Sequence, residues 1–174
     1  MIEMMIFFTG SILLLWISLP SLKIPRSHGY YRFFSWEAIL GMFCINMRHW
    51  FFDPFAWLQV ISWILLCVSL ALLISGILQL RASGKPTDAL EATTHLVQTG
   101  IYRYIRHPLY ASLLFLSWGI FLKQPTLLEG CLTVIAAAFL LATGRADESE
   151  CMTKFGQEYS SYMKKTKMFI PFVT

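Results

Sequence analysis

The longest apolar run in the chain, residues 55–80, restricts its fold more than any other feature. The run contains no charged side chain. As an α-helix of about 26 residues it would be about 39 Å long, which is enough to cross a hydrocarbon core of about 30 Å with some tilt. Because a backbone surrounded by lipid must satisfy its own hydrogen bonds, this run predicts a transmembrane helix.

Four further apolar runs predict four further spans, roughly residues 4–22, 34–52, 108–122 and 126–143. Charged residues make up only 14% of the chain, against about 25% in soluble domains. No basic segment precedes the first run, so we expect a retained span rather than a cleaved signal peptide. The sequence therefore predicts an all-α, multi-pass membrane protein with about five spans.

We expect a single integral membrane domain over residues 1–174, with three spans in 1–80. Residues 81–174 would then supply a polar connector, two more spans and a tail. The short Lys123-Gln124-Pro125 turn makes spans four and five an antiparallel helical hairpin. In the tail, Phe155, Tyr159 and Tyr162 recur at helical spacing, which predicts an amphipathic C-terminal helix.

The distribution of basic residues predicts the orientation. Twelve of the fourteen lysines and arginines fall in residues 23–32, 81–106 and 145–167, and the other two are Arg48 and Lys123. With five alternating spans, the twelve lie on one side of the membrane. The positive-inside rule makes that side cytoplasmic and places the N-terminus outside. Basic residues divided among membrane-flanking segments also argue against a nucleic-acid partner.

Metal chemistry is not indicated by the sequence. The four cysteines show no CxxC spacing, and the histidines form no HxxxH pair. Three of the cysteines lie inside apolar runs, where they behave as small hydrophobes. We expect no metal site and no disulfide framework.

Residues 96–112, LVQTGIYRYIRHPLYAS, concentrate polar chemistry at the start of span four. Pro108 suits a first helical position, and Gly100 permits a tight turn before Tyr102. The hairpin should bring this segment close to the acidic end of span five, residues 145–150. Cations and carboxylates at a membrane surface suit a zwitterionic ligand. The same residues also fit a simpler interpretation, a positive-inside cluster with an interfacial aromatic belt.

LVQTGIYRYIRHPLY resembles the LVxxGxYxxxRHPxY signature of the integral-membrane methyltransferases. That superfamily includes isoprenylcysteine carboxyl methyltransferases and phospholipid N-methyltransferases. The resemblance continues through the acidic pair Asp147-Glu148 and through FGQEYSSYMKKTKMFIP. It covers roughly Thr94 to Pro171. Two motifs in the right order, separated by a helical hairpin, are more specific than either alone.

The resemblance implies S-adenosylmethionine bound at the cytoplasmic face. The cofactor-binding residues implied by position are His95, Leu96, Val97, Tyr102, His107, Pro108, Leu109, Tyr110, Asp147 and Glu148. Family members carry an arginine one turn before the acidic pair, where this chain has Thr143, and the nearest arginine is Arg145. We assign the catalytic positions to Arg106 and Arg145.

The activity implied is methyl transfer to a lipophilic membrane substrate, either an isoprenylcysteine-type carboxylate or a phospholipid amine. Two alternatives stay open. NADPH-dependent membrane sterol reductases share a related segment, but there we expect RHPNY, and this chain has Leu109 in place of the asparagine. A non-catalytic membrane subunit is the other alternative. The sequence leaves the substrate and the oligomeric state undetermined.

Overall fold

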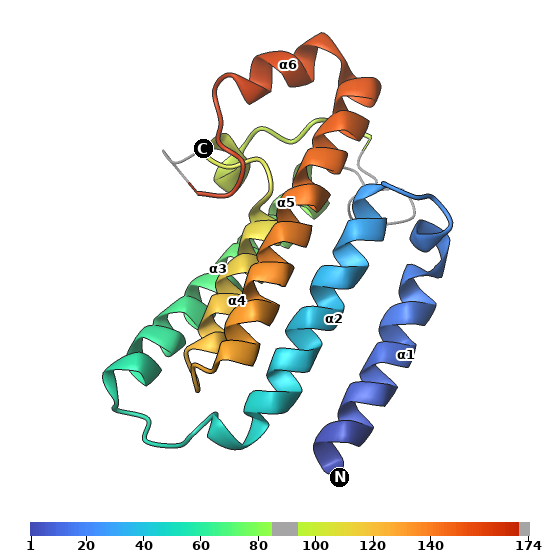
Figure 1. Cartoon of the computed structure of the whole chain (residues 1–174). Helices are drawn as coiled ribbons and strands as arrows, with labels where there is room; N and C mark the ends of the chain where they lie inside the picture. Colours follow the sequence, from blue (N-terminus) through green and yellow to red (C-terminus); the bar gives the residue numbers. More distant parts are fainter. Residues whose placement is uncertain (85–93, 171–174) are drawn as a thin grey trace. The chain divides into compact units, whose positions relative to one another are not determined.

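The computed structural model describes residues 1–84 and 94–170, which are helical with short connections (Figure 1). The helices are α1 (Ile2–Leu22), α2 (His28–Asn46), η1 (Met47–His49), α3 (Trp57–Ser83), η2 (Gly100–Arg103), α4 (Pro108–Phe121), α5 (Leu127–Phe155) and α6 (Gln157–Met163). The one pairing of β type in the described residues is an isolated bridge between Ile105 and Lys167. The predicted all-α class is confirmed.

Three described helices, α1, α3 and α5, are long and apolar enough to cross a membrane, and α4 is a shorter apolar helix. These three agree with the predicted spans one, three and five. Crossings by α2 and α4, and the total of five, remain predictions. The connector residues 85–93 and the tail residues 171–174 lie outside the described part of the chain.

The chain forms two compact units. The first unit comprises residues 1–67 and 114–147, and the second comprises residues 68–113 and 148–174. Each of α3, α4 and α5 contributes one part to each unit.

In the first unit, α1 and α2 form an antiparallel helical pair (Figure 1). Hydroxyl and amide side chains join its helices to one another. The Ser11 hydroxyl donates to Oε2 of Glu37 at 2.7 Å, and the Thr133 hydroxyl donates to the sulfur of Met42 at 3.2 Å. The Asn46 amide donates to the Ile120 carbonyl at 3.0 Å. Such bonds can hold helices together where the surroundings add little hydrophobic drive.

Lys123, predicted at a turn outside the membrane, is buried in the first unit. Its side chain donates to Gln59 Oε1 at 3.1 Å. Its ammonium lies 3.6 Å from the centroid of the Trp63 ring. A cation–π contact and a hydrogen bond together compensate the burial of this charge.

Two helices extend beyond the apolar runs that predicted spans two and five. Helix α2 begins at His28, six residues before the predicted start, because Ser27 caps it by accepting a hydrogen bond from the Tyr30 backbone N–H at 3.2 Å. Helix α5 continues to Phe155, twelve residues past the predicted end at Thr143. Hydropathy marks the edge of an apolar run, whereas the polar residues after Thr143 are compatible with helix.

In the second unit, α3 and α4 are joined by the Ser69 hydroxyl, which donates to the Ser112 carbonyl at 2.7 Å. Gly76 allows a close approach, since a Cβ there would lie 2.9 Å from a methyl of Leu109. Gly100 has φ +60°, as its predicted turn requires, and α4 begins at the predicted Pro108. The polar segment before α4 is thereby fixed in the second unit.

Candidate functional site

The backbone of residues 104–107 is held by the tail that follows α6. The Arg106 N–H donates to the Lys167 carbonyl at 2.8 Å, and the His107 N–H donates to the Met168 carbonyl at 3.1 Å. In return, the Lys167 N–H donates to the Tyr104 carbonyl at 3.2 Å. These bonds fix the Arg106-His107 segment at the start of α4.

Arg106 forms the strongest polar contact of this segment, with Glu148 of α5. The Arg106 Nε donates to Oε1 of Glu148 at 2.7 Å, and Nη2 lies 2.7 Å from the same oxygen. The Arg106 and Glu148 side chains are only 9% and 12% exposed. Nη1 of Arg106 also donates to the Thr166 carbonyl. Charge-assisted bonds in such a buried place are strong and directional.

His107 lies against the same carboxylate. Its Nε2 is 3.5 Å from Oε1 of Glu148. Its ring stacks on Tyr110 with a centroid distance of 5.4 Å and an interplanar angle of 20°, and Phe169 meets it edge-on at 6.2 Å. His107 and Tyr110 are both buried. One carboxylate thus faces a guanidinium and an imidazole, beside aromatic rings.

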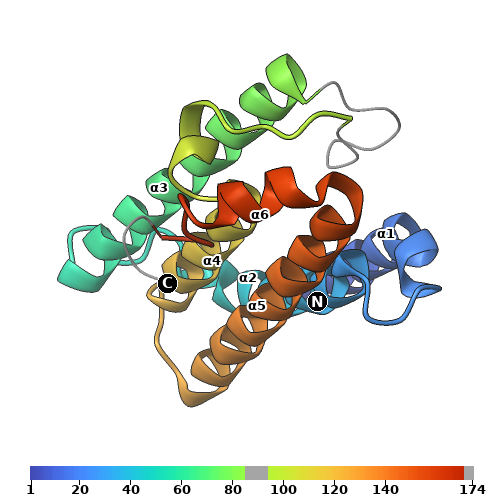
Figure 2. The same cartoon turned by 90° about the horizontal axis from the view of Figure 1, so that it is seen from above.

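Helix α6 supports the segment that precedes α4. The chain bends at Gly156, where α5 gives way to α6 (Figure 2). The Tyr162 hydroxyl donates to the Tyr102 carbonyl at 2.6 Å. Burial raises the pKa of Tyr162 above its ordinary value, so this phenol remains a donor at neutral and moderately alkaline pH. The predicted tail aromatics Tyr159 and Tyr162 are both buried.

Several of the predicted cofactor-binding residues pack in an apolar core of the second unit. Val97 and Tyr102 are buried with Leu80, and Leu109 packs against them. Pro108 is fully buried, and Leu96 is half-buried. These side chains shape the backbone that presents Arg106 and His107. His95 is different, because it is exposed and its Nδ1 lies 2.9 Å from the neighbouring Thr94 hydroxyl.

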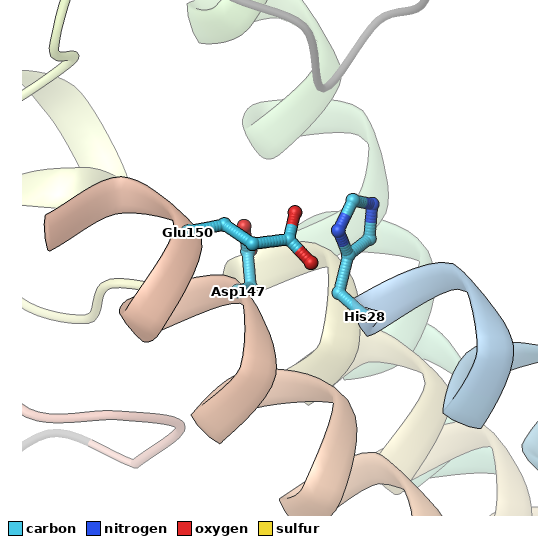
Figure 3. Close-up of side chains that lie close together, drawn as sticks. All are labelled: His28, Asp147 and Glu150. Atoms are coloured by element: carbon cyan, nitrogen blue, oxygen red, sulfur yellow. The ribbon is translucent and has the colours of Figure 1, made fainter. Parts of the chain in front are cut away.

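The two residues of the predicted acidic pair differ in their surroundings. Glu148 contacts Arg106, whereas Asp147 belongs to the first unit, where an oxygen of its carboxylate lies within 4.8 Å of a ring nitrogen of His28 (Figure 3). Neighbouring residues of an α-helix point in directions about 100° apart, which accounts for the difference. Figure 3 also labels Glu150, three residues further along α5 than Asp147.

The two arginines predicted at catalytic positions also differ in their surroundings. Arg106 is part of the buried ion pair, whereas Arg145 is exposed in the first unit. Thr143, at the position where the family carries arginine, is fully buried and donates to the Phe139 carbonyl at 2.7 Å. The Thr143 hydroxyl finds its hydrogen-bond acceptor within the same helix. This position therefore carries no charge.

Thr166 and His28 were not identified from the sequence. Thr166 stands between two lysines of the tail, so its surroundings resemble a solvated segment, yet it is buried and its carbonyl binds Arg106. His28 stands in a predicted connector and is in fact the first residue of α2. The one local signal for His28 was Ser27 directly before it, a residue type that often caps a helix.

We define the RHE cluster as the side chains of Arg106, His107, Tyr110 and Glu148. It combines a cation, an acceptor carboxylate, an imidazole and an aromatic plane within one unit. Carboxylate and guanidinium groups bind ligands that carry both charges and hydroxyls. The chemistry of the RHE cluster therefore suits a zwitterion with an aromatic base, with the groups already held in place by the tail.

A sequence model described as phospholipid methyltransferase matches residues 57–158 of the chain. The match includes the whole RHE cluster and stops before Tyr162 and Thr166, which support it. Comparison with curated proteins and with solved structures gave no match.

Proposed function

The chain belongs to the phospholipid methyltransferase family, and from this we propose that it transfers a methyl group from S-adenosylmethionine to the amine of a membrane phospholipid. The observation that carries the proposal is the RHE cluster, a buried set of opposite charges inside the matched range. A lipophilic acceptor is consistent with helices long and apolar enough to cross a membrane.

S-adenosylmethionine carries a carboxylate, an ammonium, ribose hydroxyls and an adenine ring, and the donor set of the RHE cluster fits each of these. We propose that Glu148 accepts from an ammonium or a ribose hydroxyl and that Arg106 orients an anionic group. The rings of His107 and Tyr110 stack with their centroids 5.4 Å apart. We propose that a base packs against this aromatic pair. When bound, the cofactor supplies an electrophilic methyl group on its sulfonium.

The protein's task is then to hold the acceptor in line with the methyl group and to exclude water. With an amine acceptor, a nitrogen–carbon bond forms as the sulfur–carbon bond breaks. S-adenosylhomocysteine and one proton are released. The amine must therefore reach the site unprotonated or lose its proton there. An isoprenylcysteine carboxylate would need no such step and is the alternative acceptor.

We further propose that the RHE cluster faces the cytoplasm, with the N-terminus on the opposite side. The support is the distribution of lysine and arginine, twelve of which flank spans on one side of a five-span topology. S-adenosylmethionine is charged, so a site at the aqueous face of the membrane suits its arrival better than one within the hydrocarbon.

The test is a binding titration followed by an activity assay on the purified full chain. S-adenosylhomocysteine is titrated by calorimetry, with NADPH as the control titrant. His107→Ala and Glu148→Ala should abolish measurable binding while the protein still inserts. Gln98→Ala serves as a matched control, because this exposed side chain donates to Glu158 outside the RHE cluster.

Methyl-labelled S-adenosylmethionine is then offered with phosphatidylethanolamine vesicles or with a prenylcysteine analogue. Label in the phospholipid supports the proposal. Label in the prenylcysteine alone would identify its carboxylate as the acceptor in place of the phospholipid amine. Binding of NADPH without S-adenosylhomocysteine would identify a reductase instead. Binding of neither would overturn the enzymatic proposal.

A further inference from the structure

The first unit contains an apolar groove bordered by α1, α2 and the start of α5. Its volume is about 600 Å³, within the range of small-molecule sites. The apolar part of the lining includes Phe7, Phe8, Gly41, Cys44, Leu128 and Leu132. Phe8 and Leu128 are 58% and 60% exposed, so the groove is accessible from the outside of this unit.

The charged side chains that line this groove are both acidic, Glu3 and Glu37. Glu3 is neutralised by Arg48, whose Nε donates to it at 2.6 Å. Glu37 lies near the middle of α2, and its Oε2 accepts a hydrogen bond from Ser11 at 2.7 Å. Its other oxygen, Oε1, is buried and has no hydrogen-bond partner among the described residues.

A carboxyl oxygen without a donor in apolar surroundings is costly, and a charged group within a transmembrane bundle commonly marks a binding site. A ligand that brings a positively charged donor would remove this cost. The terminal torsion of glutamate is soft, so either oxygen can turn toward such a donor. We propose that the groove binds a lipophilic amine, with its ammonium at Glu37 and its alkyl chain lying against Gly41 and Leu128.

The dimensions of the groove agree with an alkyl chain. From Glu37 to Ile45, which both line it, α2 advances about 12 Å. Gly41 lies between them and leaves room, since the nearest atom to a Cβ built there is on the Phe7 ring, 3.8 Å away. A larger side chain at position 41 would therefore extend into the groove without a backbone clash.

This inference is independent of the proposed function. All the lining residues belong to the first unit, and none belongs to the RHE cluster. A chain that fails to methylate any acceptor could still bind an amine in this groove, and the test therefore measures occupancy of the groove rather than turnover.

The experiment uses the full chain in phosphatidylcholine nanodiscs and dicyclohexylcarbodiimide, an apolar reagent that modifies carboxyl groups in apolar surroundings. Labelling of the Glu37 peptide is followed by mass spectrometry with dodecylamine, dodecanol or dodecanoic acid present. Dodecylamine should reduce Glu37 labelling severalfold. Glu129 provides the internal reference, because its carboxyl is also buried but does not line the groove.

Two variants distinguish binding of dodecylamine in the groove from general effects of an amphiphile. Gly41→Leu should retain Glu37 labelling and lose protection by dodecylamine. Glu37→Gln should lose labelling at that peptide, and its thermal stabilisation by dodecylamine should fall below that of the unmodified chain. Equal protection by dodecanol, equal protection of Glu129, or no protection at all would each overturn the proposal.

Discussion

Arg106 and Glu148 depend on each other, since each is the other's main countercharge in a place with little water. Replacing either by alanine leaves one buried charge uncompensated, which we expect to cost about 3 kcal/mol of unfolding free energy without cofactor. The double variant Arg106→Ala/Glu148→Ala should lose clearly less than the sum of the two. Thermal unfolding of the four proteins in one detergent measures this coupling.

Arg103→Ala is the matched control for that cycle, because Arg103 lies three residues earlier and is exposed. Its effect should stay within about 0.5 kcal/mol. Strictly additive losses in the double variant would show that Arg106 and Glu148 do not stabilise one another.

Tyr162 makes the stability of the second unit depend on pH in the alkaline range. Burial raises its pKa in the folded state, so its stabilising effect is complete below the ordinary tyrosine pKa of about 10 and declines as pH rises above that value. Tyr162→Phe should cost about 1 kcal/mol at neutral pH, by removing the bond to the Tyr102 carbonyl. It should also make stability fall less steeply above pH of about 10.

Unfolding at neutral and alkaline pH checks both parts of this expectation. Tyr104→Phe is the control, since Tyr104 is 52% exposed. An unchanged alkaline slope in Tyr162→Phe would mean that the phenol titrates as freely in the folded state as in the unfolded one.

At the scale of elements, the bend between α5 and α6 depends on Gly156. Its φ of +53° with ψ of −124° is a conformation that residues with a Cβ rarely adopt. A Cβ there would meet no atom within 4 Å, so the cost of Gly156→Ala is backbone strain alone, about 1–3 kcal/mol. Because α6 carries Tyr162, we also expect weaker binding of S-adenosylhomocysteine.

Gly130→Ala is the opposite case. Gly130 lies inside α5, where an added Cβ would make an ordinary 3.7 Å contact with the Phe121 ring. Alanine should be neutral or stabilising there by up to about 1 kcal/mol. Comparison of the two melting temperatures tests the argument, which fails if both alanines have the same effect.

For the whole molecule, the five-span prediction places the turn between spans four and five on the opposite side of the membrane from the tail. In a cysteine-free chain, Gln124→Cys and Lys165→Cys should react with a membrane-impermeant maleimide from opposite sides of sealed vesicles. Both residues are exposed, so burial will not hide the result. Labelling of both from the same side would show that span five does not cross the membrane and would overturn the five-span topology.

The sequence predicted the helical class, the family and the start of α4 at Pro108, and it singled out Arg106 and His107 as candidate site residues. These depend on hydropathy and on local motifs. It did not predict Thr166 as a partner of Arg106, because the two are sixty residues apart and join only through tertiary structure. The divergence of Asp147 and Glu148 was missed for a related reason, since a linear motif does not specify which side of a helix faces which neighbour.

The backbone pairing of residues 104–107 with residues 167–168 also determines when this segment can become fixed during biosynthesis. The ribosome makes Arg106 and His107 long before Met168, yet the backbone of these two residues is fixed by bonds to Lys167 and Met168. A nascent chain could insert its apolar helices and still lack a finished RHE cluster. The backbone of the RHE cluster would then be fixed only after residues 167 and 168 have been synthesised.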